Sequence, residues 1–340
     1  MDAVLKTLTP IYLFLSLSCF FLLPTGISAQ KEPTKKVDIY NMVVAQDGSG
    51  DFTTIQEAIN SAKGFPDQRV TINVKNGTYR EKVEVYEWNS HMSIIGEDKE
   101  KTIITYDDYF DKINLGRNST FHTPTFLVQG NDFYAVNLTI ENTAGEVGQA
   151  VALAVNASRA LIENCRITGN QDTLYTTGEG FKQYYRDCYI EGTTDFIFGQ
   201  ATALFQNCVI HSKSESFITA ASTPKGTDFG YVFKDCKLTT DEGLNKVYLG
   251  RPWRTYAKTV FINCYMGNHI IPKGWDNWSN KEAEKETLYA EYDCNGPGFR
   301  PEKRVSWSHQ MKGSEAKKYS VENILDDGHV DGKAWYLKFK

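Results

Sequence analysis

Histidine is scarce in this chain, and none of it is arranged for chemistry. The 340 residues contain six histidines, which have neither metal-ligand spacing nor a serine motif nearby. The Gly-x-Ser-x-Gly turn that exposes a nucleophilic serine is absent. We interpret all six as structural or surface residues: His91, His122, His211, His269, His309 and His329. Reaction chemistry, if the chain has any, must then come from carboxylates, and we expect no metal and no cofactor.

An excess of positive charge is also missing. Lys and Arg number 37 against 42 for Asp and Glu, which gives a formal net charge of −5. Because a nucleic-acid partner calls for a basic face, this balance argues against one.

Long hydrophobic runs are confined to the N-terminus. Lys6 precedes an apolar run over residues 11–23, and small residues follow near Ala29, a pattern typical of a secretory signal peptide. The run is short for a membrane span, and no later segment is longer, so a signal anchor is the weaker alternative. We predict a signal peptide over residues 1–29, a short polar segment over 30–42 and one domain over 43–340. The protein is then secreted, without stable membrane association.

Secretion bears on the cysteines and the glycosylation sequons. Of seven cysteines, Cys19 lies in the predicted signal peptide, five of the others recur in a column, and Cys294 stands apart. An oxidising compartment permits disulfides between stacked cysteines, whereas small buried thiols pack equally well, so both alternatives stay open. The sequons that lie outside apolar runs, and are the better candidates for glycans, are Asn76, Asn118 and Asn277.

The cysteine column belongs to a repeat that is clearest over residues 162–199. Two versions of one pattern follow each other, each with Asn or Asp before a cysteine (Cys165 and Cys188), an apolar residue two positions on, a Gly-containing turn and an aspartate. Asp172 and Asp195 each follow their cysteine by seven residues. The repeat therefore places the two aspartates beside each other.

Three more copies surround Cys208, Cys236 and Cys264, so that successive cysteines are 23, 20, 28 and 28 residues apart. Short β-prone runs at such a period, without helical patterns between them, indicate a solenoid. Leucine-rich repeats share the period but would show a leucine consensus, which is absent. We predict an all-β, right-handed parallel β-helix, in which equivalent residues of neighbouring coils lie about 4.8 Å apart.

Both ends of the solenoid carry signals of their own. Residues 54–57 form a capping box ahead of apolar residues at helical spacing, and Gly64 follows, which predicts a short helix that covers the first coil. Near the other end, residues 281–286 indicate a charged loop, and residues 319–325 with Trp335 are expected to pack back along the coils. The first strands are expected at residues 70–74, 82–85, 93–96, 102–105, 126–128 and 135–140.

The two aspartates have two interpretations. Asp is common in turns, which is the simpler one. Asp172 is followed by Thr173-Leu174, however, and Asp195 by an apolar and aromatic run, where an unpaired charge is expensive. Acids in such surroundings mark catalytic sites, so we favour a catalytic pair.

Five motifs, in order between residues 43 and 335, resemble those of the plant pectin methylesterases (pectinesterases). They are Gly77 to Glu81 (GTYRE), Gln149 to Leu153 (QAVAL), Gln171 to Leu174 (QDTL), Asp195 to Gly199 (DFIFG) and Leu249 to Trp253 (LGRPW). One such motif is weak evidence, but five in order are specific. The resemblance implies a secreted plant cell-wall enzyme that removes the C6 methyl esters of homogalacturonan and releases methanol and pectate. Only about ten polar residues follow the predicted signal, as in the form without an inhibitor-like pro-region.

The resemblance assigns roles to five polar residues. Asp195 is the nucleophile that forms an acyl-enzyme, and Asp172 is the acid that protonates methanol and then the base that activates water. Arg251 keeps Asp195 ionised through a bidentate contact. Gln149 and Gln171 donate hydrogen bonds to the oxyanion.

The resemblance also implies a groove lined by aromatic rings, because the C–H faces of sugars stack on aromatic planes. Aromatic residues make up 13% of the chain, more than we expect a narrow β-helix core to need. For any one of them, core packing is the alternative. The residues that match groove positions are Phe121, Tyr175, Phe198, Trp253 and Trp275.

The partner implied by the resemblance is methyl-esterified homogalacturonan, with a proteinaceous pectin methylesterase inhibitor as a further candidate, and we expect a monomer. Two other functions stay open. One is a polygalacturonase or pectate lyase, although neither a Gly-His-Gly motif nor a calcium-binding acid cluster is visible. The other is an inactive wall-binding protein on the same scaffold.

Overall fold

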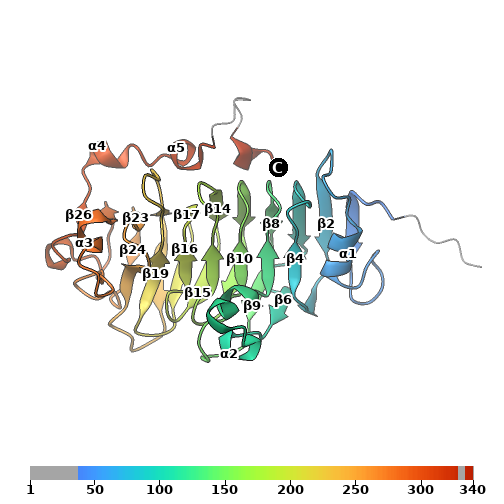
Figure 1. The fold of residues 1–340 in the computed structure, drawn as a ribbon, viewed down its shortest axis with the longest axis horizontal. Coiled ribbons are helices and arrows are strands. Elements are labelled where there is room, and N and C mark those ends of the chain that lie inside the picture. The colour runs from blue at the N-terminus through green and yellow to red at the C-terminus, as the bar shows by residue number, and fades with distance from the viewer. Residues whose placement is uncertain (1–36, 328–333, 340) are drawn as a thin grey trace, which may run out of the picture. The chain divides into compact units, whose positions relative to one another are not determined.

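The fold was analysed in a computed structural model, which describes residues 37–327 and 334–339. The predicted signal peptide and His329 lie outside the described residues. From Val37 onward the chain forms one compact unit. Its strands lie in three parallel sheets, and successive strands along the chain pass from one sheet to the next (Figure 1). The predicted all-β parallel β-helix is confirmed.

The three sheets are named A, B and C. Sheet A contains β1 (Asn41–Val44), β2 (Val70–Val74), β5 (Met92–Gly96), β8 (Tyr134–Val136), β11 (Ala160–Glu163), β14 (Lys182–Arg186), β17 (Thr202–Gln206), β20 (Tyr231–Lys234), β23 (Lys258–Ile262), β25 (Leu288–Tyr292) and β26 (His309–Gln310). Sheet B contains β3 (Gly77–Arg80), β6 (Thr102–Tyr106), β9 (Thr139–Asn142), β12 (Arg166–Thr168), β15 (Tyr189–Gly192), β18 (Val209–Ser212), β21 (Lys237–Thr240) and β24 (Tyr265–Met266). Sheet C contains β4 (Val83–Val85), β7 (Phe126–Val128), β10 (Leu153–Val155), β13 (Leu174–Thr176), β16 (Ile197–Gly199), β19 (Phe217–Ala221) and β22 (Tyr248–Pro252).

The helices of the described residues are short. They are α1 (Ile55–Ser61), α2 (Phe110–Ile113), α3 (Ala283–Glu286), α4 (Gly313–Ala316) and α5 (Val321–Leu325), with 3-10 turns η1 (Gly116–His122), η2 (Pro301–Lys303) and η3 (Trp335–Leu337). None of the helices in this part of the chain has the length and apolar character of a membrane span.

The Asn or Asp before each column residue turns the chain from sheet A to sheet B. At Asn164, between β11 and β12, the backbone is left-handed with φ 48°, and the equivalent residues of the other coils share this conformation. Asn and Asp tolerate it better than other non-glycine residues. Their side chains also bond along the stack: the Asn164 amide donates to Asn137 Oδ1 at 2.7 Å, and that of Asn263 donates to Asp235 Oδ1 at 3.2 Å. The repeated Asn/Asp-Cys pair is thus a corner with a fixed backbone requirement.

The cysteines behind these corners are buried free thiols, so the thiol alternative holds and the disulfide alternative does not. From the sequence we expected Cys294 to stand apart from the column. In the structure it extends the column. Asp293, which precedes Cys294, has φ 48°. The Cys294 Sγ atom lies 3.5 Å from the Phe261 carbonyl oxygen, just as the Cys264 Sγ atom lies 3.5 Å from the Phe233 carbonyl oxygen. The match was hidden because a longer step precedes it.

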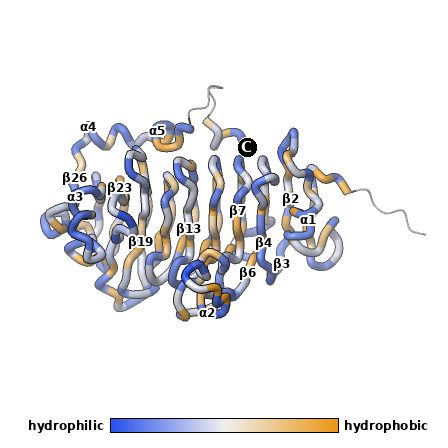
Figure 2. Tube along the Cα trace, viewed as in Figure 1, coloured by the Kyte–Doolittle hydropathy of each residue, from blue (hydrophilic) through white to orange (hydrophobic). Residues whose placement is uncertain are grey.

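Inside the coils, residues from equivalent strand positions stack on one another. Phe205 packs face to face with Tyr185 at 4.8 Å and with Phe233 at 4.5 Å, and Phe233 with Phe261 at 4.6 Å between ring centroids. Hydrophobic positions recur along the strands of successive coils (Figure 2). Much of the aromatic content therefore belongs to the core, so the expectation that the core needs few aromatic residues was wrong.

The elements at the first coils follow the sequence pattern closely. Helix α1 begins after Thr54, whose side chain accepts from the Glu57 amide, and it buries Ile55 and Ile59 against the first coils. It ends at Ser61, three residues before Gly64. The predicted strand over residues 135–140 is two strands, β8 and β9, because the chain turns a corner at Asn137 (φ 59°).

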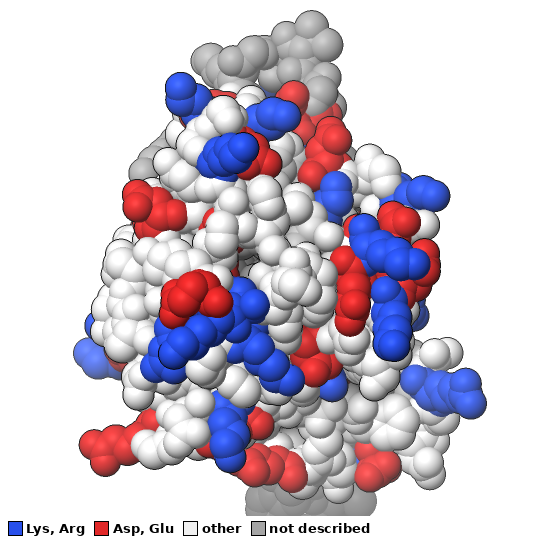
Figure 3. All heavy atoms as spheres, turned by 90° about the vertical axis from the view of Figure 1, so that its left-hand side faces the viewer, with Lys and Arg blue, Asp and Glu red and all other residues white. Residues whose placement is uncertain are grey.

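The C-terminal tail lies across the outer face of sheet A, as predicted (Figure 1). Tyr319, Ile324 and Trp335 pack on Leu161, Tyr184 and their stacked neighbours, which form a second apolar cluster. The expected charged loop at residues 281–286 is partly helical: α3 buries Ala283 and exposes its charges. Over the end of the stack near β26 and α3, basic and acidic side chains are interspersed (Figure 3).

Candidate active site

A cleft of about 320 Å³ lies on the outer face of sheet C. Its floor includes Phe198, Ala220 and Arg251, which belong to a longer column of residues that lie opposite one another on successive strands. The column runs through Glu84, Leu127, Ala154, Tyr175, Phe198, Ala220 and Arg251. The walls at the catalytic end bring together all five polar residues singled out in the sequence: Gln149, Gln171, Asp172, Asp195 and Arg251.

The two aspartates stand just before β13 and β16, on neighbouring coils. The pairing of Leu174 with Ile197 places Asp172 opposite Asp195, so the juxtaposition expected from the repeat is confirmed. Both have left-handed backbones, with φ of 65° and 49°. They are also nearly buried, with 9% and 5% of their surface exposed. The starts of these two strands thus bring two nearly buried carboxyl groups to one cleft.

Arg251 makes the two carboxyl groups chemically different, because it pairs with Asp195. Its Nε donates to Asp195 Oδ1 at 2.9 Å and its Nη2 donates to Oδ2 at 2.6 Å, a bidentate pair. The guanidinium lies 4.0 Å from the Phe217 ring centroid and 3.7 Å from that of Trp278, so two aromatic rings hold it in place. No side chain in residues 37–327 or 334–339 donates a hydrogen bond to the Asp172 carboxyl group.

These surroundings give the two acids different proton affinities. Burial, and then the negative charge of Asp195, raises the pKa of Asp172 well above its ordinary value. Burial also raises the pKa of Asp195, but the hydrogen bonds and charge of Arg251 oppose the rise. The surroundings therefore favour the proton on Asp172 and the charge on Asp195.

Gln149 and Gln171 supply uncharged donors at the same site. They lie opposite each other in an isolated parallel bridge, so Gln149 comes from the coil that precedes Gln171. Neither side-chain amide bonds to another group in the described part of the protein, and both line the cleft. Two pairs of N–H donors are thus available to a ligand.

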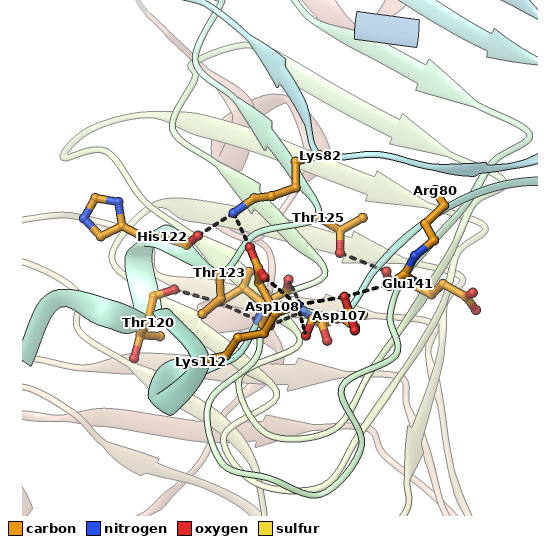
Figure 4. Close-up of polar contacts among 12 residues, drawn as sticks. Arg80, Lys82, Asp107, Asp108, Lys112, Thr120, His122, Thr123, Thr125 and Glu141 are labelled. Carbon is orange, nitrogen blue, oxygen red and sulfur yellow. Dashed lines mark hydrogen bonds and ion pairs between the residues drawn. The ribbon is translucent and has the colours of Figure 1, made fainter. Parts of the chain in front are cut away.

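One wall of the cleft comes from a non-repeating segment, residues 107–125, between β6 and β7. Its 3-10 turn η1 carries Arg117, Thr120 and Phe121 to the cleft. Arg117 and Thr120 have no repeat signal in the sequence. Lys82, which directly precedes β4, contacts residues near both ends of the segment (Figure 4).

The Lys82 contacts form the clamp of this segment. Its ammonium group donates to Asp108 Oδ2 at 2.8 Å near the start and to the His122 carbonyl oxygen at 2.7 Å near the end. Lys112 Nζ lies 3.0 Å from the other oxygen of Asp108. Although burial alone raises the pKa of Asp108, these two lysines lower it below its ordinary value. Since His122 follows Phe121 directly, the clamp fixes the position of the wall.

Lys82→Met should loosen this wall without unfolding the protein. Because a partly exposed ion pair contributes roughly 1 kcal/mol, we expect KM to rise about three- to five-fold with kcat little changed. Tryptic cleavage after Arg117 should also become faster. The matched control is Lys75→Met, which removes an exposed pair with Glu97 (3.0 Å) away from the cleft. Equal proteolysis of the two variants contradicts the clamp.

The aromatic residues expected in the groove are placed there with one exception. Phe121, Phe198 and Trp253 line the cleft, and Tyr175 stacks on Phe198 with ring centroids 4.7 Å apart. Trp275 was a wrong assignment: it is fully buried, and it stacks on Tyr289 in the core at 4.4 Å.

Trp278, rather than Trp275, lines the cleft. The two tryptophans lie three positions apart in an irregular segment, and no local sequence pattern distinguishes them. Of the described histidines, none lines the catalytic cleft. His269 is buried among apolar groups, and burial lowers its pKa to about 4.

A parallel β-helix with two stacked carboxyl groups, one of them paired with arginine, defines a carboxylate-dependent class of β-helix enzymes. The chain belongs to the pectinesterase family, whose sequence profile (Pectinesterase) matches residues 41–328. Pectinesterase 31 of Arabidopsis thaliana is 40% identical over 291 residues, which cover 83% of this chain and 91% of that protein. The structure matches that of pectin methylesterase from carrot with a TM-score of 0.79 at 32% identity, covering 84% of this chain and 93% of the other.

Other relatives are longer than this chain. Putative pectinesterase/pectinesterase inhibitor 38 of Arabidopsis thaliana is 42% identical over 311 residues, which are 86% of this chain but 63% of that protein. A pectin methylesterase solved in complex with a hexasaccharide matches with a TM-score of 0.72 at 27% identity, covering 86% of this chain and 99% of the other.

Proposed function

We propose that this pectinesterase hydrolyses the C6 methyl esters of homogalacturonan through an acyl-enzyme on Asp195. The observation that carries the proposal is the asymmetry of the carboxyl pair: Arg251 forms a bidentate pair with Asp195, whereas Asp172 is buried and forms no ion pair within the described residues. One acid is thereby prepared as an anion and the other as a proton donor, as a two-step acyl transfer requires.

In the first step an Asp195 oxygen attacks the ester carbonyl carbon. The carbonyl oxygen becomes an oxyanion and accepts hydrogen bonds from the Gln149 and Gln171 amides. The carbon–methoxy bond then breaks, and the Asp172 carboxyl group transfers its proton to the departing oxygen. The products are methanol, an Asp195–galacturonyl anhydride and an ionised Asp172.

The second step regenerates both acids. The Asp172 carboxylate accepts a proton from water as the water oxygen attacks the galacturonyl carbonyl of the anhydride. The bond to Asp195 breaks, which releases a de-esterified galacturonic acid and restores the Asp195 carboxylate next to Arg251; the galacturonic acid then loses its proton to solvent and becomes galacturonate. Atoms and charges balance with water as the only co-substrate.

The aromatic residues along sheet C support a polysaccharide as the substrate. Phe121, Phe198 and Trp253 line the cleft, and Tyr175 packs between Phe121 and Phe198. Pyranose rings stack on aromatic planes of this kind. We further propose that the protein is secreted after loss of residues 1–29 and acts as a monomer in the plant cell wall. A proteinaceous inhibitor is a candidate partner, since several relatives carry an inhibitor in their names.

Methanol release from highly methylated pectin tests this function, with a calcium chelator present or absent. We expect methanol in both conditions and no unsaturated chain ends. Unsaturated ends that require calcium would indicate a lyase, new reducing ends a polygalacturonase, and no product of any kind an inactive scaffold. The assay therefore separates the proposal from each alternative.

A further inference from the structure

The floor of the groove extends beyond the catalytic cleft. Phe121 lines both the cleft and a second hollow of about 490 Å³, which lies over β4 and β7. Glu84 and Leu127, the first two members of the floor column, also line this hollow. From Tyr175 to Glu84 the column crosses three inter-coil steps, or about 14 Å. The hollow is therefore a continuation of the same groove.

The second hollow has its own aromatic plane. Tyr86, one of its lining residues, stacks on Trp88 with ring centroids 4.7 Å apart and an interplanar angle of 15°. Trp88 is 47% exposed, which is unusual for so large an apolar ring. A sugar that leaves the catalytic cleft past Phe121 thus meets a further stacking surface.

Glu84 carries the unneutralised charge of the hollow. Its backbone N–H donates to Gln56 Oε1 at 2.7 Å, and its carbonyl oxygen accepts from Gln56 Nε2 at 3.2 Å. These two hydrogen bonds fix the strand there. The Glu84 carboxylate, however, has no hydrogen bond or ion pair within residues 37–327 and 334–339. Lys82 also lines the hollow, but its ammonium is already occupied by Asp108 and the His122 carbonyl.

We propose that this hollow is a distal subsite for the same polysaccharide chain, and that Glu84 makes it select methyl-esterified over de-esterified galacturonate. The inference rests on the proposed function. A methyl ester is neutral and leaves Glu84 undisturbed, whereas a galacturonate carboxylate places a like charge beside it. A chain stretch that has been demethylated is then held less firmly, and the enzyme leaves its product.

Inhibition by polygalacturonate measures this selection directly. Glu84→Gln keeps the shape and removes the charge, so the Ki for polygalacturonate against methanol release should fall roughly two- to five-fold at low ionic strength, the effect of one partly screened charge pair. At high salt the difference should disappear. The KM for highly methylated pectin should change by a smaller factor than this Ki, because the neutral ester places no charge beside Glu84.

Two controls locate the effect. Glu302→Gln makes the same charge change on an exposed residue of η2, outside the groove, and should leave Ki unchanged. Oligogalacturonides too short to reach from the catalytic cleft to Glu84 should inhibit wild type and Glu84→Gln equally. Equal effects of both substitutions, or an unchanged Ki in Glu84→Gln, overturn the subsite.

Direct binding keeps this test separate from the proposed function. If the protein releases no methanol at all, the proposed function fails, yet binding of polygalacturonate and of highly methylated pectin can still be compared between wild type and Glu84→Gln. A gain in affinity confined to polygalacturonate supports the subsite. Equal affinity changes for the two polymers refute it.

Discussion

Arg251→Lys should lower kcat about ten-fold or more while leaving the fold intact. Lysine keeps the charge, but its single ammonium cannot bridge both Asp195 oxygens as the guanidinium does at 2.9 and 2.6 Å. It also lacks the planar group that packs between Phe217 and Trp278. Asp195 is then free to rotate away from the ester carbonyl, and steady-state methanol release measures the loss.

The pH profile of the same variant shows how Arg251 acts. Because Arg251 opposes the rise in pKa that burial gives Asp195, a weaker partner lets that pKa rise further. The nucleophile must be ionised, so the acid limb of kcat/KM should move to higher pH. A kcat loss with an unmoved acid limb would assign Arg251 a purely geometric role.

The matched control for this substitution is Arg186→Lys. Arg186 is similarly half-buried and pairs with Glu163 at 3.0 Å through Nε, but it lies on sheet A, away from the cleft. This control measures the cost of replacing a paired arginine as such. Wild-type turnover in Arg186→Lys, together with a large loss in Arg251→Lys, assigns the effect to the site.

The repeat made the fold and the carboxyl pair predictable. Asn164 and its equivalents mark each corner because few residue types accept a left-handed backbone there. Asp172 and Asp195 come into register because each follows its cysteine by seven residues. Where coil length changes, spacing no longer gives the register: Leu138 and Cys165 are 27 residues apart, whereas Gln149 lies opposite Gln171, 22 residues further on.

Residues outside the repeat were not predictable in the same way. Arg117 and Thr120 reach the cleft on an inserted segment, whose position depends on contacts of Lys82 with residues 26 and 40 positions away. The choice between Trp275 and Trp278 depends on an irregular segment in which residues 278 and 279 both have positive φ. Such placements follow from tertiary contacts that no local pattern encodes.

The two aspartates should be separable by the leaving group of the substrate. Methoxide needs a proton as it departs, whereas a phenolate of low pKa departs unassisted, so an activated aryl ester of a galacturonate bypasses the acid. In Asp172→Asn the nucleophile remains and acylation proceeds, but no base activates water.

Phenolate release by the two variants then distinguishes the roles. Asp172→Asn should give a burst of about one phenolate per enzyme and then a slow phase, because the acyl-enzyme accumulates. Asp195→Asn lacks the nucleophile and should give no burst, while methanol release from pectin falls steeply in both. A burst in Asp195→Asn instead reverses the two roles. Slow turnover without a burst in both variants points to direct attack by water, since a site without an acyl-enzyme has nothing to accumulate.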